Sequence, residues 1–270
     1  MKFGIEPKPV EYEPLTVKLL QSRGDFGPLE FSISEESHKK TLTLLNRNTE
    51  VEPLDLGSLL PSELWGCARV LSNYFGRLNE VAISRTQWVI SGKAFPTDTL
   101  TARSRVVKTE LRKGLPFALV ETTTADTGGN TLMSQLDELL LFHEVIDWAY
   151  KERFVADELS TELSIPRTVY FRHNWDPSLW KNNIHTNNYA RKFGYELGLP
   201  EFIMYMDWVW DALFRIEGER AYNYSLDIPI ILPIYEGDKI DVRMRKQDSG
   251  YKVTFTKGNF LRLKGLVCPE

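Results

Sequence analysis

The strongest constraint on the fold of this 270-residue chain is a pattern that occurs twice at one fixed separation. The turn Thr97-Asp-Thr-Leu100 aligns with Gly237-Asp-Lys-Ile240 at an offset of 140 residues. The same offset places a predicted helix at 61–75 on a second predicted helix at 201–215 without a gap. Because an internal repeat shifts every element by the same distance, the agreement indicates a duplicated unit.

The two helices differ in character. The first begins with Pro61, which suits a first turn, and is followed by Gly76, which suits an end. Its apolar residues share one face at helical spacing: Leu64, Cys67, Ala68, Leu71 and Phe75. The second helix, within the run Phe202–Phe214, is apolar almost all round, which predicts a buried central helix.

Short β-type segments, separated by turn residues, follow each helix. In the first unit they are 87–90, 99–107, 117–124 and 132–142, and in the second 222–232, 239–245, 251–256 and 260–267. Two further strands are expected at Leu15–Leu20 and Leu29–Ile33, while Thr41–Leu45 fits either a strand or a helix. This order predicts an α+β fold with two repeats of a long central helix wrapped by an antiparallel sheet. The expected boundaries are a first unit at 1–146, a charged and partly helical connector at 147–163, and a second unit at 164–270.

Composition excludes several classes of protein. A net charge of −4 and a pI near 5.7 leave no basic face for nucleic acid. No apolar run is long enough to span a membrane, and the first residues lack the apolar centre of a signal peptide. With Cys67 and Cys268 as its only cysteines, the chain is not expected to hold a disulfide framework, so the cytoplasm is the expected location. No histidine pair is spaced like metal ligands, and we expect neither a metal nor another cofactor.

A polar segment ahead of the second helix carries a resemblance to a known family. Asn182-Asn-Ile-His185-Thr-Asn-Asn-Tyr-Ala-Arg191 resembles the N-P-I-H-x-D-x-x-Y-A-R motif of the MaoC-like, or hydratase 2, double hotdog proteins. It is one residue shorter and has Asn187 in place of the aspartate. The turns at 96–100 and 236–240 resemble the P-G-D-T-L turn of that family, and Phe193-Gly-Tyr195 matches its glycine step, with Gly198 a second glycine nearby.

The resemblance implies a dehydratase or hydratase acting on 3-hydroxyacyl or enoyl thioesters. Such a reaction needs a base, an acid and donors to the thioester oxygen. In the family a histidine acts with an acid five residues earlier, and backbone amides at the start of the central helix polarise the carbonyl. His185 takes the place of this histidine, but Trp180 stands where the acid is expected. The polar partner of His185 is then expected to be Asp176 or Asn183.

The remaining candidates are expected to line the substrate site: Trp180, Asn182, Gly198, Tyr205 and Asp207. Asp207 fits a satisfied buried polar group better than a catalyst. His38 and His143 belong to no motif and are interpreted as surface or packing residues. Tryptophans at 175, 180, 208 and 210 suit a bulky apolar acyl chain, as in polyketide or fatty acid metabolism.

Two alternatives remain open. Asn183-Ile-His185-Thr-Asn187-Asn188 also resembles the N-x-H-V-N-N motif of double hotdog thioesterases, which hydrolyse acyl-carrier-protein thioesters. A repurposed or catalytically lapsed hotdog would instead bind an acyl or polycyclic ligand, or shape a cyclisation or isomerisation. The expected partner is a thioester of CoA or of an acyl-carrier protein, and a homodimer is compatible with the fold.

Overall fold

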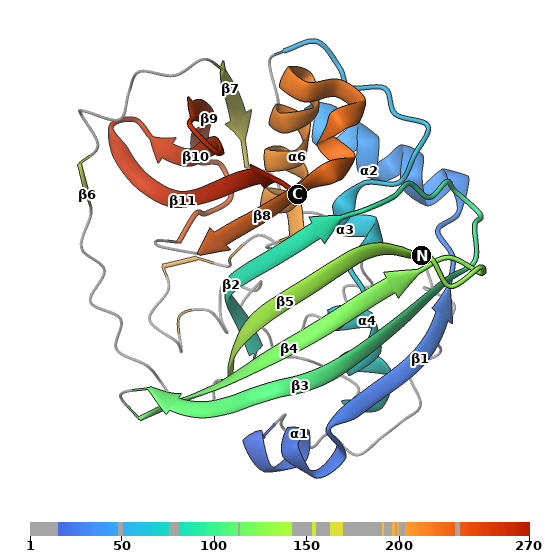
Figure 1. The fold of residues 1–270 in the computed structure, drawn as a ribbon. Helices are drawn as coiled ribbons and strands as arrows, with labels where there is room; N and C mark the ends of the chain where they lie inside the picture. Colours follow the sequence, from blue (N-terminus) through green and yellow to red (C-terminus); the bar gives the residue numbers. More distant parts are fainter. Residues whose placement is uncertain are drawn as a thin grey trace.

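The computed structural model describes residues 16–47, 51–75, 81–112, 114–141, 153–154, 163–169, 191, 196–197, 199, 203–229 and 233–270. Its centre is one antiparallel sheet, against which the helices pack (Figure 1). The strands are β1 (Asp25–Phe31), β2 (Val81–Ile90), β3 (Leu100–Arg112), β4 (Leu115–Ala125), β5 (Thr131–Leu141), β6 (Arg153–Phe154), β7 (Leu163–Thr168), β8 (Tyr224–Pro229), β9 (Lys239–Gln247), β10 (Gly250–Lys257) and β11 (Phe260–Pro269). The helices are α1 (Val17–Arg23), α2 (Glu35–Arg47), α3 (Pro61–Leu64), α4 (Cys67–Phe75) and α6 (Ile203–Glu217), followed by the 3-10 helix η4 (Gly218–Asn223).

The strand order is β1-β3-β4-β5-β2-β8-β11-β10-β9-β7, with the short β6 beside β11. Strands from the two parts of the sequence meet in the middle, where β2 pairs with β8 from Arg85 opposite Pro229 to Val89 opposite Ser225. The large antiparallel sheet and the helices that accompany it confirm the predicted α+β class. None of the helices in the described ranges combines the length and apolar character that a membrane-spanning helix requires.

The main strands and the second helix lie where the sequence predicts them, with boundaries shifted by up to six residues, most at the start of β2. The strand expected at Leu15–Leu20 is wrong, because Val17–Arg23 form helix α1. The Thr16 hydroxyl accepts a hydrogen bond from the Leu19 amide at 3.1 Å, which caps this helix. The ambiguous residues 41–45 belong to α2, and β7 was not predicted.

The predicted helix at 61–75 is broken in two at Trp65 and Gly66. Trp65 has an extended backbone, with φ −66° and ψ 105°. Gly66 lies so close to the sheet that a Cβ atom there would be 2.7 Å from Cβ of Ala102 and 3.0 Å from Oγ1 of Thr124. The chain therefore approaches the sheet more closely at this point than a continuous helix with side chains permits.

Helix α6 is the centre of the larger apolar core, as the apolar run predicts. Met206, Trp208, Val209, Trp210 and Leu213 are all fully buried. Their cluster also contains buried residues from the N-terminal part of the chain: Leu60, Leu64, Trp88 and Ile90. A second, smaller cluster lies beneath α4. The larger core is thus shared by the two parts of the sequence.

Candidate functional site

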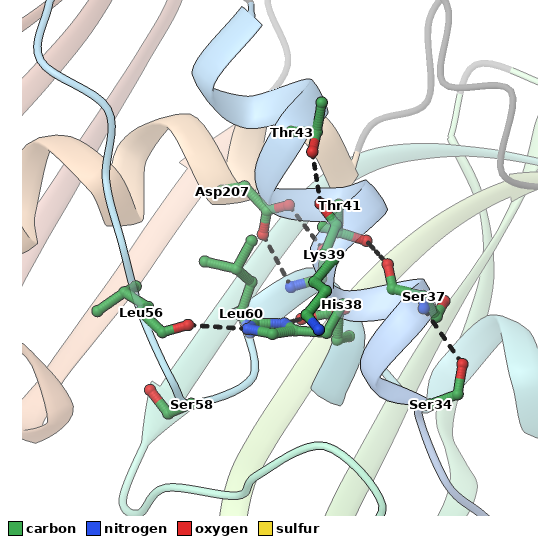
Figure 2. A network of polar contacts seen from close by, with 12 residues as sticks. Ser34, Ser37, His38, Lys39, Thr41, Thr43, Leu56, Ser58, Leu60 and Asp207 are labelled. Carbon is green, nitrogen blue, oxygen red and sulfur yellow. Dashed lines mark hydrogen bonds and ion pairs between the residues drawn. The ribbon is translucent and has the colours of Figure 1, made fainter.

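A buried polar network joins α2, α3 and α6, and His38 is at its centre (Figure 2). His38 is only 4% exposed. Its Nε2 lies 2.9 Å from the carbonyl oxygen of Leu56, and its Nδ1 lies 2.8 Å from Oε2 of Glu63. Because a carbonyl oxygen only accepts hydrogen bonds, Nε2 must carry a hydrogen.

Glu63 makes His38 a favourable site for a second proton. Its Oε2 also accepts a hydrogen bond from the Leu60 amide at 2.9 Å. Burial alone would lower the pKa of His38, but the hydrogen bond and the charge of Glu63, together with the Leu56 carbonyl and the charge of Asp207, raise that pKa. The contacts therefore fit an imidazolium paired with a carboxylate, with hydrogens on both ring nitrogens.

Asp207 extends the network into α6. Its Oδ1 accepts a hydrogen bond from the Ser62 amide at 3.0 Å, and its Oδ2 accepts one from the Ser62 hydroxyl at 2.7 Å. Asp207 and Ser62 are each 3% exposed. The carboxylate expected to contact substrate thus has both oxygens engaged by the protein.

Tyr205, the other predicted site residue on α6, lies in the aromatic core. It is 6% exposed, and its ring meets that of Phe255 edge-on, with the centroids 5.8 Å apart. Burial raises the pKa of Tyr205, with a contribution from the charge of Asp238. Its hydroxyl therefore stays protonated at physiological pH and can only act as a neutral hydrogen-bonding group.

A second buried carboxylate, Asp137, lies on β5 below the start of α4. It accepts hydrogen bonds from Trp65 Nε1 at 2.9 Å and from the Thr86 hydroxyl at 2.5 Å. Burial raises the pKa of Asp137, although these bonds act in the opposite direction. Nearby Cys67 is 1% exposed, and burial raises the pKa of its thiol well above the usual value. Cys67 is therefore a buried, neutral thiol, as predicted from its place among apolar residues.

The other predicted site residues lie outside the described ranges: Asp176, Trp180, Asn182, Asn183, His185 and Gly198. In sequence, all six precede α6, which starts at Ile203. Of the predicted site residues, Tyr205 and Asp207 lie within the described ranges, two residues apart in α6. Their buried surroundings agree with the apolar character of the helix.

His38 and Glu63 are the polar residues that sequence reasoning missed. They are separated by 25 residues and belong to different helices, so no local spacing links them. The one sequence signal is Glu63 just inside a proline-initiated helix, where a carboxylate favours the exposed amides of the first turn. With both nitrogens of His38 engaged and the ring buried, this network is arranged to join elements rather than to exchange protons with a substrate.

No family model matches the sequence, and no curated protein matches it at the sequence level. Solved structures, in contrast, are similar over nearly the whole chain. HtdX of Mycobacterium tuberculosis is 11% identical with a TM-score of 0.66, and the match covers 91% of this chain and 100% of HtdX. A MaoC-like dehydratase from Phytophthora capsici is also 11% identical, with a TM-score of 0.65 and coverage of 95% and 99%.

A thioesterase is also similar in structure, with a lower TM-score. The acyl-ACP thioesterase from Bacteroides thetaiotaomicron is 12% identical with a TM-score of 0.55, and the match covers 91% of this chain and 98% of that one. At such identities the likeness concerns the fold. The chain therefore has the hotdog fold of the MaoC-like dehydratases, in agreement with the resemblance seen in its sequence.

Proposed function

We propose that this protein is a hotdog enzyme that hydrates or dehydrates an acyl thioester of the 3-hydroxyacyl or enoyl type. The observation that carries the proposal is a coincidence of fold and motif. The fold is that of the MaoC-like dehydratases, and the His185 motif that resembles theirs directly precedes α6 in the sequence. A fold alone does not specify a reaction, so the histidine motif is essential to this proposal.

The proposed chemistry assigns a role to each predicted residue. His185 removes the proton next to the thioester carbonyl and returns it to the leaving hydroxyl, and Asp176 or Asn183 orients its ring. Backbone amides in the first turn of α6 stabilise the negative charge that develops on the thioester oxygen. The residues proposed to line the acyl site are Trp180, Asn182, Gly198 and Tyr205.

We further propose that the chain is a double hotdog, with units at 1–146 and 164–270 joined by 147–163. Read inward from the two edges, the strand orders are β1-β3-β4-β5-β2 and β7-β9-β10-β11-β8, which follow one scheme. The repeated turns also have the same hydrogen bonds. The Phe95 and Tyr235 amides each donate to the aspartate three residues later, at 2.7 and 3.1 Å. The Asp98 and Asp238 amides donate back to Phe95 and Tyr235, both at 3.1 Å.

The function is tested with His185→Ala and, as a matched control, His173→Ala, which removes the other histidine of the same polar segment. Enoyl- and 3-hydroxyacyl-thioesters of increasing chain length are followed by the absorbance of the conjugated enoyl group. Loss of a general base typically lowers turnover by about 10²–10⁴-fold. We expect that loss in His185→Ala and near wild-type rates in His173→Ala. Wild-type rates in His185→Ala would refute the assignment.

Thioester hydrolysis is a second candidate. It is favoured by the Asn183–Asn188 segment, which resembles a thioesterase motif, and by the likeness of the fold to a thioesterase. The same substrates separate the two reactions, because hydrolysis releases a free thiol whereas hydration leaves the thioester intact. Thiol release that depends on His185, without a change in the enoyl group, would replace the first proposal with the second.

A lapsed enzyme that only binds its ligand is the third candidate, and it is favoured by Trp180 at the position of the usual acid. It predicts no turnover of any thioester, together with a measurable dissociation constant for an acyl or polycyclic ligand. Trp180→Asp provides a direct comparison. A gain of dehydration in this variant would identify position 180 as the point at which the acid was lost.

A further inference from the structure

The contact between Ser62 and Asp207 joins the starts of two helices that are far apart in the sequence. Ser62 is the second residue of α3, and Asp207 lies in the second turn of α6, 145 residues later. Both hydrogen bonds, from the amide at 3.0 Å and from the hydroxyl at 2.7 Å, go to a charged acceptor in a buried place. Such bonds are strong and directional. Because two donors of Ser62 reach the two oxygens of one carboxylate, the bonds fix both the distance and the orientation of Asp207 relative to Ser62.

Ser62 is itself held in place from the other side. Its neighbour Glu63 accepts hydrogen bonds from the Leu60 amide and from His38 of α2. His38 in turn donates to the Leu56 carbonyl. Figure 2 shows His38 and Asp207 of this network, with the hydrogen bond between His38 and the Leu56 carbonyl as a dashed line. α3 is therefore a fixed support, and α6 is the element that Asp207 ties to it.

We propose that Asp207 is a positioning residue for the reaction: through Ser62 it sets the place of the first turn of α6. The inference rests on the proposed function, in which amides of that turn stabilise charge on the thioester oxygen. Asp207 is four residues beyond Ile203, so it lies about 6 Å along the axis from the helix start. A shift of about 1 Å in groups that contact the reacting atoms can lower a rate by about 100-fold.

The ion pairs of α6 among the described residues lie further along the helix, where Asp211 meets Arg167 and Arg215 and Glu217 meets Arg220. The two neighbours of Asp207 in the sequence, Met206 and Trp208, are both fully buried. The contact between Ser62 and Asp207, in the second turn, is therefore closer to the helix start than any of these ion pairs.

The test compares Ser62→Ala, Asp207→Ala and Asp207→Asn with Ser58→Ala as the matched control. Ser58 is also a buried serine that bonds across the two parts of the chain, but its bond goes to the hydroxyl of Tyr222 in η4, at 2.6 Å, and not to a residue of α6. Each variant is assayed well below its melting temperature, and kcat is expressed per folded molecule. We expect Ser62→Ala and Asp207→Ala to lower kcat about tenfold or more while KM changes less than about twofold.

The conservative variant and the double variant sharpen the test. In Asp207→Asn one oxygen still accepts from the Ser62 amide, and the side-chain amide can donate to the hydroxyl, so kcat should stay within about threefold of wild type. Ser62→Ala combined with Asp207→Ala should be no slower than Asp207→Ala alone, because Asp207→Ala already removes the hydroxyl bond that Ser62→Ala removes. Ser58→Ala should lose stability but keep its kcat.

Hydrogen exchange gives a readout that does not depend on turnover. In Ser62→Ala, amides at 203–210 should exchange faster, whereas those at 211–217 should be unchanged. Unchanged exchange at 203–210, wild-type kcat in both alanine variants, or an equal loss of kcat in Ser58→Ala would each overturn the positioning role alone. A wild-type protein that turns over no thioester would overturn the proposed function, and the positioning role with it.

Discussion

Arg167 of β7 and Asp211 of α6 form an ion pair whose side chains are 0% and 1% exposed. Arg167 also donates a hydrogen bond to the Leu45 carbonyl in the last turn of α2, at 3.0 Å. Asp211 accepts a further bond from Arg215, at 2.9 Å. The pair thus fastens an edge strand and the central helix to the end of a helix from the N-terminal part of the chain.

Removal of Arg167 should destabilise the protein strongly. Arg167→Met leaves the buried Asp211 with Arg215 as its only cation among the described ion pairs and leaves the Leu45 carbonyl without this donor. Breaking a buried pair in this way costs about 3–5 kcal/mol. Urea unfolding measures the loss, and Arg85→Met is the control. Arg85 pairs with Asp227 on the surface, where such a pair contributes about 0–1 kcal/mol. Equal losses in the two variants would contradict the structural difference between them.

Gly66 should not tolerate even one added methyl group. Gly66→Ala would place a Cβ atom 2.7 Å from Cβ of Ala102, and overpacking of this kind typically costs about 1–3 kcal/mol. Gly57→Ala is the control, because a Cβ at Gly57 meets nothing within 4 Å. Thermal unfolding of both variants checks the prediction. A melting temperature of Gly66→Ala equal to that of Gly57→Ala would show that the sheet and helix separate without cost.

Thr97 and Gly237 occupy equivalent positions in the repeated turn, with φ of 75° and 84°. This backbone region is unfavourable for a β-branched residue and open to glycine. Gly237→Thr should therefore destabilise the protein by about 1–3 kcal/mol. Thr97→Gly should stabilise it by up to about 1 kcal/mol, since relief of strain is partly offset by a more flexible unfolded chain. Denaturant midpoints of both variants give the signs, and a destabilised Thr97→Gly would contradict the prediction.

The His38–Glu63 pair should make stability depend on pH with a definite sign. Glu63 raises the pKa of His38 in the folded protein above its unfolded value of about 6.5. The resulting stabilisation is complete below about pH 6.5 and is lost as pH rises through the raised pKa. The difference between the free energies of unfolding of the wild type and of His38→Asn should fall as pH rises over that window. In Glu63→Gln burial dominates the pKa of His38, so the same difference should instead rise with pH up to about 6.5. The same slope in both proteins would refute the ion pair.

Much of the fold follows from local patterns. Strand β4 alternates between buried and half-buried residues, with Ala118, Val120, Thr122 and Thr124 facing the interior, and α6 is apolar on all sides. Both patterns are visible in the sequence because each reflects the period of its own element. The apolar residues at 15–20 gave the wrong element, since a short apolar run fits a helix turn as well as a strand.

The contacts that were missed are those made by tertiary structure. The helix at 61–75 is broken because Gly66 packs against Ala102 on a strand that is distant in the sequence. The residues around position 66 carry no local pattern that predicts this contact. The His38–Glu63 and Ser62–Asp207 pairs join residues 25 and 145 positions apart. The resemblance to a family, in contrast, depended on a short motif around His185, and it correctly indicated the hotdog fold.

The junction between β2 and β8 has a consequence for dividing the chain. A cut in the sequence between Leu141 and Arg153 would leave each fragment with one inner edge strand, whose backbone groups pair with the other fragment from Arg85 to Val89. Buried Trp88 and Ile228 would be uncovered at the same edges. Since open, apolar edges seek partners, the two fragments should reassemble when they are expressed together and aggregate when they are expressed apart. The protein is thus a natural starting point for a split reporter.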